Sequence, residues 1–130
     1  MNLMDACFNF YIQLLNKLKM KEYFLLLRGG RSAENTTPEE RMAEMAKWGP
    51  FMGKFGQQIT GGLPFQSGGN VVSENGISNL PVDGANGIAG GWLVVKAESM
   101  DEATAIANEC PHIAYGGNIE VREIAPMPAM

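Results

Sequence analysis

The amino-acid sequence predicts an α+β fold in which an antiparallel sheet carries helices on one of its faces. Three observations lead to this prediction. Short apolar runs typical of strands alternate with two longer segments of helical periodicity. Each helical segment begins with a capping box, at residues 37–40 and 99–102. The chain has 130 residues and is 45% hydrophobic, which suffices for a single domain with one core.

The first two elements of the domain are a strand over Lys21–Arg28, ended by a pair of glycines, and a helix over 37–59. Thr37 is the predicted N-cap of the helix, and the glutamate three residues later completes its capping box. Pro50 lies inside the helix. Because proline has no backbone N–H to donate, we predict a kink or a break near Gly49.

The middle of the chain is predicted to contain a turn at 60–62, followed directly by a second strand. The stretch Asn70–Leu80 is typical of a small hairpin around Asn75 and Gly76, a favoured type I′ pair. A glycine-rich loop then leads to a third strand over Gly91–Ala97.

The last two elements are a helix and a strand. Ser99 is the predicted N-cap of the helix, its apolar side runs to Cys110, and Pro111 ends it. The final strand covers Asn118–Ile124 and alternates apolar and charged residues. The order strand, helix, strand, strand, helix, strand contains two split crossover units. It therefore predicts a ferredoxin-like βαββαβ sandwich with both helices on one face.

Residues 1–19 are predicted to form an amphipathic helical extension of the domain, which we assign to residues 20–130. Apolar residues recur there at helical spacing: Phe8, Tyr11, Ile12, Leu15 and Leu18. The segment lacks the basic start and the small-residue cleavage site of a signal peptide. Two interpretations stay open. The helix docks against the domain or a second subunit, or it is an extension with little role, because Met20 would serve as a start.

Composition and charge argue against several function classes. A net charge of −4 gives no basic footprint for nucleic acid. Cys7 and Cys110 make no disulfide framework, and they fit a reducing, cytoplasmic compartment. Together with a single histidine they do not make a metal site, and we expect no cofactor. The apolar runs are too short to span a bilayer, so we expect no membrane contact.

The first and third predicted strands are apolar on both faces. Phe24 and Leu26 oppose the core residues of the first strand, and Trp92 and Val94 oppose those of the third. Since helices cover only one face, something else must cover the second. A second subunit that packs sheet to sheet is the simplest cover, so we predict a homodimer.

Several segments of the chain resemble the YCII-related domain family, and within it the DGPF-domain branch. The matching segments are 24–30, the helix through Lys47-Trp48, Val82-Asp83-Gly84, 90–92, 101–103, Cys110-Pro111-His112 and 116–122. The resemblance covers roughly residues 20–126 and implies a dimeric α/β barrel built from ferredoxin-like subunits. It also implies a histidine–aspartate pair as the active site. A few relatives act on small aromatic substrates. The chain departs from the branch pattern after Asp83-Gly84, where alanine and asparagine replace proline and phenylalanine.

The predicted topology brings three polar residues to one edge of the sheet: Arg28, Asp83 and His112. A carboxylate beside an imidazole orients the ring and favours its charged form, as a general acid–base group at neutral pH requires. Arg28 is the candidate clamp for a substrate carboxylate or enolate. Trp48 and Tyr115 are candidates for an aromatic wall.

Each of these residues also has a structural interpretation: His112 as a helix cap, Asp83 as a turn residue, Arg28 as an ion-pair partner, and Trp48 and Tyr115 as packing residues. Two functions therefore stay open. One is a metal-independent small-molecule enzyme of the isomerase or lyase type, with proton transfer by His112 and Asp83. The other is a non-catalytic dimeric module that binds a ligand or a protein.

Overall fold

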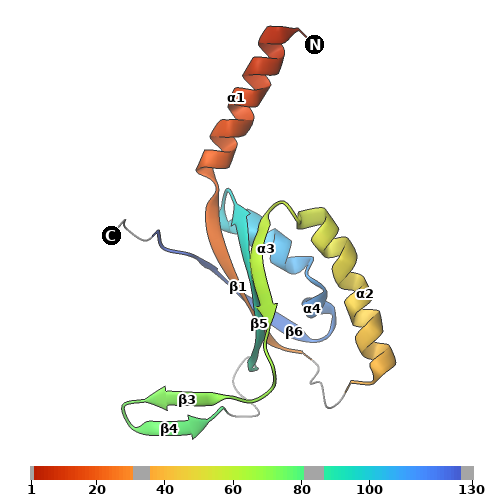
Figure 1. Cartoon of the computed structure of the whole chain (residues 1–130), viewed down its shortest axis with the longest axis vertical. Coiled ribbons are helices and arrows are strands. Elements are labelled where there is room, and N and C mark those ends of the chain that lie inside the picture. The colour runs from red at the N-terminus through yellow and green to blue at the C-terminus, as the bar shows by residue number, and fades with distance from the viewer. Residues whose placement is uncertain (1, 31–35, 81–86, 127–130) are drawn as a thin grey trace.

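A four-stranded antiparallel sheet forms the centre of the molecule (Figure 1). The computed structural model describes residues 2–30, 36–80 and 87–126. The sheet has the order β2-β5-β1-β6, and its strands are β1 (Lys21–Gly29), β2 (Ile59–Pro64), β5 (Ala89–Ala97) and β6 (Gly117–Glu123). The other elements are α1 (Leu3–Lys19), α2 (Pro38–Phe55), β3 (Asn70–Ser73), β4 (Gly76–Asn79), α3 (Met100–Asn108) and α4 (Pro111–Ala114).

The strand order confirms the ferredoxin-like prediction. The inner strand β1 pairs antiparallel with both β5 and β6, so the first strand of the sheet lies beside the last, which forms one edge. The β3–β4 hairpin is inserted between β2 and β5 and forms a separate two-stranded sheet. Its strands pair Ser73 with Gly76, so the turn lies at Glu74 and Asn75, one position earlier than predicted.

The core lies between one face of the sheet and the helices α2 and α3. Alternate residues of β1 and β5 point into it, and Leu25 and Val95 are fully buried. Among the residues that the structure describes, the buried hydrophobic ones are Tyr23, Leu25, Leu27, Phe51, Leu93, Val95, Ala97, Ala103, Ile106, Ala107 and Cys110. Ile119 and Val121 of β6 pack against this cluster from the edge of the sheet, as the alternation in the sequence predicted.

The opposite face of the sheet is also apolar and is left only half-buried. Phe24 and Leu26 of β1 lie beside Trp92 and Val94 of β5, with the rings of Phe24 and Trp92 stacked at 5.8 Å. The helices that pack on the core lie on the other side of the sheet (Figure 1). The single-chain fold therefore leaves apolar surface where the sequence predicted a subunit contact.

Both predicted N-caps are confirmed. The Thr37 hydroxyl accepts a hydrogen bond from the Glu40 backbone N–H, and the Ser99 hydroxyl accepts one from that of Glu102, each at 3.1 Å. The Glu102 carboxylate also accepts from the side chain of Gln58 at 2.8 Å. This bond ties the beginning of α3 to the connection between α2 and β2.

The predicted boundary between the first helix and the second strand is wrong by several residues. The helix ends at Phe55 rather than at residue 59, and Ile59 begins β2 and pairs with Val95. Gly62, predicted as part of a turn, lies within this strand. A Cβ at Gly62 would lie 2.5 Å from Leu93 Cδ2 and 2.7 Å from the Trp92 carbonyl oxygen. Glycine is therefore needed here for close strand packing rather than for a turn.

Of the kink or break predicted near Gly49, the break does not occur, since α2 continues as one helix to Phe55. Proline removes a single hydrogen bond from the helix ladder. The next residue, Phe51, is buried in the core and packs edge-on against Trp48 at 5.7 Å. Packing on both sides of the proline thus holds the helix together.

Helix α1 is confirmed as a helix and projects away from the sheet (Figure 1). The Asn2 side chain accepts a hydrogen bond from the Asp5 backbone N–H at 2.8 Å and so caps its first turn. Large apolar side chains along it are exposed, among them Met4, Phe8 and Tyr11. Among residues 2–30, 36–80 and 87–126, no helix has the length and apolar character needed to cross a membrane.

Candidate functional site

The only histidine of the chain lies at the junction of α4, β1 and β6. Pro111 begins the short helix α4, which places His112 in its first turn. The His112 Nε2 atom lies 2.7 Å from the backbone carbonyl oxygen of Arg28, at the end of β1. Because a carbonyl can only accept, Nε2 carries the hydrogen, and Nδ1 is left as the nitrogen that can take up a proton.

Two glycines make room for the His112 ring. A Cβ at Gly117 would overlap the ring, and a Cβ at Gly30 would lie 3.0 Å from its Cε1 atom. Gly30 also has a φ of +85°, a conformation that glycine adopts without strain. In the sequence both positions belong to glycine pairs that are typical of turns, and this is why their contribution to the site was missed.

Arg28 and His112 come together, as the topology predicted, although the contact uses the Arg28 backbone. The Arg28 guanidinium donates a long hydrogen bond to the Gly87 carbonyl oxygen at 3.4 Å. Gly87 lies so close to Gly29 that a Cβ on it would lie 2.5 Å from the Gly29 Cα atom. The chain at Gly87 therefore packs on the end of β1. Asp83 itself lies outside the described residues.

The two candidate aromatic residues have different surroundings. Tyr115 follows α4, and its ring lies 4.9 Å from the ammonium nitrogen of Lys47 on α2. Trp48 is partly buried and packs against the core beside Phe51. The Trp48 ring therefore supports the hydrophobic core, and its role as a substrate wall stays a prediction.

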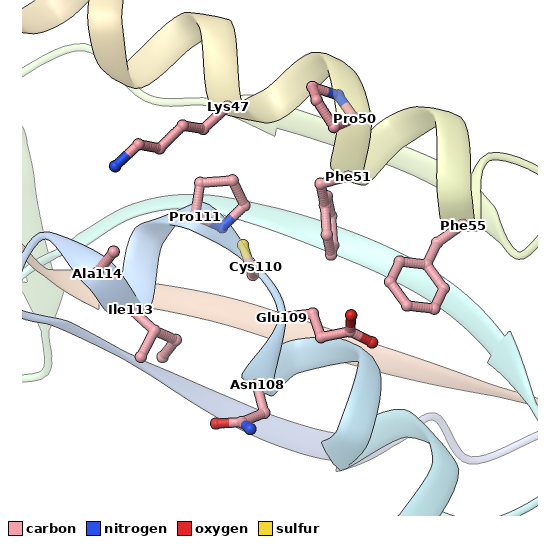
Figure 2. Close-up of a pocket in the computed structure, with 10 residues that line it drawn as sticks. All are labelled: Lys47, Pro50, Phe51, Phe55, Asn108, Glu109, Cys110, Pro111, Ile113 and Ala114. Atoms are coloured by element: carbon pink, nitrogen blue, oxygen red, sulfur yellow. The ribbon is translucent and has the colours of Figure 1, made fainter.

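A groove of about 420 Å³ separates α2 from the segment that joins α3 to α4 (Figure 2). Phe51 and Phe55 point down from α2, and Cys110 and Pro111 face them from the other side. The groove is lined by Lys47, Pro50, Phe51, Phe55, Asn108, Glu109, Cys110, Pro111, Ile113 and Ala114. Both chain neighbours of His112 belong to this lining, while His112 itself is turned toward β1. None of these residues was predicted from the sequence to line a pocket.

The groove has a charged group at each end. Lys47 extends over α4 at one end, and a Lys54–Glu109 ion pair with an N···O distance of 2.6 Å lies at the other. Since Lys54 is neutralised by Glu109, the positive charge that a ligand would meet is that of Lys47. Within the described part of the chain, no cluster of three histidine, cysteine or acidic residues could hold a metal ion.

The chain also matches the model of a known protein family. The model of the YCII-related domain matches residues 11–128, which is most of the chain. The chain belongs to the YCII-related domain family. No curated protein matches it with significant similarity. In this YCII-related domain, the segment Cys110–His112 connects the groove to the end of β1. Cys110 lines the groove, and His112 contacts the Arg28 carbonyl oxygen at the end of β1.

Burial in the YCII-related domain raises the pKa of the Cys110 thiol from 9.0 to about 11, although a hydrogen bond from the His112 backbone N–H partly opposes the shift. The thiol is therefore neutral at pH 7 and fills the core as a small apolar group.

This pKa shift predicts a loss of stability in alkali. Below pH 9 the thiol is protonated in both the folded and the unfolded chain, so it adds no pH dependence. Between pH 9 and about 11 the unfolded chain ionises while the folded one does not, and the free energy of unfolding falls. Urea unfolding at pH 8, 9.5 and 10.5 measures the decline. The Cys110→Ala variant should show a shallower decline, and equal slopes would contradict the assignment.

Proposed function

We propose that this YCII-related domain is a metal-independent enzyme that binds a small organic acid at the end of β1 and transfers a proton with His112. The observation that carries the proposal is the hydrogen bond from His112 Nε2 to the Arg28 carbonyl. It fixes the ring orientation and the tautomer, so that one defined nitrogen, Nδ1, is available as a base. A fixed tautomer with a free second nitrogen is what general base catalysis by histidine requires.

Asp83 is proposed as the partner of His112. Gly87 packs against Gly29, one residue from the Gly30 position that borders the imidazole ring. Asp83 precedes Gly87 by four positions in the sequence, and an extended chain of that length spans up to about 14 Å. A span of that length is long enough for a carboxylate at position 83 to reach the ring.

Arg28 is proposed as the group that holds the substrate. Its guanidinium has five N–H donors in a planar fork, which matches the two oxygens of a carboxylate. Its described hydrogen bond to Gly87 is long and uses one of them. Tyr115 and Trp48 are retained as candidates for contacts with an aromatic part of the substrate.

Solvent deuterium exchange tests the proton transfer directly. Small organic acids that stabilise the wild-type protein in a thermal-shift screen are incubated with it in D₂O, and NMR follows deuterium incorporation next to the carboxyl or carbonyl group. We expect exchange to slow about 100-fold or more in His112→Ala, the lower range for general acid–base catalysis.

His112→Gln is the matched control for folding. Its side-chain amide can still donate to the Arg28 carbonyl, so the variant should keep the melting temperature of the wild type and yet lack exchange. Exchange at the wild-type rate in a folded His112→Gln variant would rule out His112 as the base.

A non-catalytic binding module is the second candidate, because the groove between α2 and α4 does not include His112 among its lining residues. The groove volume falls within the range of small-molecule sites, and its floor is apolar. The same screen separates the two functions. A ligand that stabilises His112→Ala but not Ala114→Trp, which fills the groove, supports the module. A ligand lost only in His112→Ala supports the enzyme.

Three further proposals complete the functional assignment. The half-buried apolar face with Phe24 and Trp92 supports a homodimer that packs sheet to sheet. Membership in the DGPF branch of the family is the second proposal, and the resemblance of the residues around Asp83 and Trp92 to that branch supports it. The two free cysteines support a cytoplasmic location.

A further inference from the structure

The groove between α2 and the segment that joins α3 to α4 has two apolar walls that the core holds in place (Figure 2). Phe51 and Phe55 project into it from α2, and Pro111 faces them from the beginning of α4. Phe51 and Pro111 are buried, so neither wall can move away without disturbing the core. The groove is therefore a preformed apolar site, and its volume of about 420 Å³ suits a small molecule.

We propose that this groove binds the anion of a medium-chain carboxylic acid, with the carboxylate at Lys47 and the alkyl tail along Phe51 and Phe55. The proposal rests on the second candidate function, the binding module, and names its ligand. It does not depend on proton transfer by His112.

The charges at the two ends of the groove determine the direction of the ligand. At one end Lys54 is paired with Glu109 at 2.6 Å. At the other end the Lys47 ammonium nitrogen lies 4.9 Å from the centroid of the Tyr115 ring. An aromatic ring attracts a cation without neutralising it, so Lys47 still attracts an anion. A single lysine acts as a point charge and matches the single negative charge of a carboxylate.

The distance between these ends determines the length of the tail. Lys47 and Lys54 lie two helical turns apart on α2, about 10 Å along the axis, which is roughly the length of an extended eight-carbon chain. The Lys54–Glu109 pair crosses from α2 to the end of α3. A longer tail would therefore meet two charged groups instead of apolar side chains.

An NMR titration of the full-length protein with octanoate tests the role of Lys47. We expect Lys47→Gln to raise the dissociation constant of octanoate about fivefold or more, as for the loss of a hydrogen bond to a charged group. Octanamide has the same chain without the charge, so it should bind the wild type and Lys47→Gln equally. Equal dissociation constants of octanoate for the two proteins, or no saturable binding to the wild type, would overturn the proposal.

Two variants control for the place of binding. Lys21→Gln removes the same charge from an exposed position at the beginning of β1, outside the groove lining, and should leave octanoate binding unchanged. Ala114 is exposed and lines the groove, so Ala114→Trp should fill the groove and abolish binding in a folded protein. Octanoate that still binds to folded Ala114→Trp lies elsewhere on the molecule, and this result would contradict the assignment.

A series of chain lengths tests the position of the tail. From butyrate to octanoate, each added methylene should lower the dissociation constant about twofold to fourfold, as apolar surface is buried. Dodecanoate should bind no more tightly than octanoate, because the Lys54–Glu109 pair ends the apolar surface. A continued gain at dodecanoate would overturn the placement of the tail. Deuterium exchange depends on His112 and this titration on Lys47, so either proposal can fail while the other stands.

Discussion

Replacing Leu25 by alanine is expected to lower the free energy of unfolding by about 2–5 kcal/mol, the range for large-to-small changes in a closed core. Leu25 is fully buried in the central strand, with Leu93 and Val121 as its cross-strand neighbours. Since both flanking strands hold it, the surrounding structure cannot collapse easily into the space that the leucine leaves. Urea unfolding followed by circular dichroism measures the change.

Met42→Ala provides the matched control for this prediction. Met42 lies on α2 and is 74% exposed, so its truncation should change the free energy of unfolding by no more than about 0.5 kcal/mol. A comparable loss in the two variants would mean that the core does not centre on β1.

The second large effect is expected on the uncovered face of the sheet. Trp92→Glu places a charge beside Phe24, against which the indole ring stacks at 5.8 Å. If a second subunit covers this face, the glutamate loses its hydration at the centre of the contact. We expect the dissociation constant of the dimer to rise about 30-fold or more, as for an interface hot spot. Sedimentation equilibrium over a range of concentrations measures it.

Two controls separate association from folding in this experiment. Trp92→Phe keeps an aromatic ring on the face and should keep most of the association. Gln57→Glu adds the same charge in an exposed turn outside the sheet, and it should have no effect. Unchanged association in a folded Trp92→Glu variant would contradict sheet-to-sheet packing.

The sequence predicted the elements that depend on local chemistry. The caps at Thr37 and Ser99 hold because a hydroxyl bonds to a backbone N–H only three residues away. The boundary of β2 could not be predicted in the same way. Gly62 has the composition of a turn, and only its packing against Leu93 shows that it belongs to a strand. A glycine in a turn and a glycine in a closely packed strand have the same local sequence pattern, and only a contact with residues distant in the sequence distinguishes them.

The sequence likewise predicted only part of the candidate site. Strand order is enough to bring Arg28 and His112 to one edge of the sheet, and this meeting was expected from the sequence. The bond itself uses the Arg28 carbonyl rather than its guanidinium, which side-chain chemistry does not reveal. The groove was missed because its lining comes from α2 and from the α3–α4 connection, whose relative placement follows from the packing of Phe51 and Cys110 in the core.

The two glycines beside His112 have a consequence for how this surface tolerates change. Gly30 is exposed and Gly117 is half-buried, so accessibility alone would rank both as replaceable positions. Each instead borders the volume that the imidazole ring occupies. Adding a single methyl group at Gly117 would push the ring away from the Arg28 carbonyl and so release α4 from the end of β1. At this junction, mutational tolerance is therefore governed by the space that the histidine needs rather than by exposure to solvent.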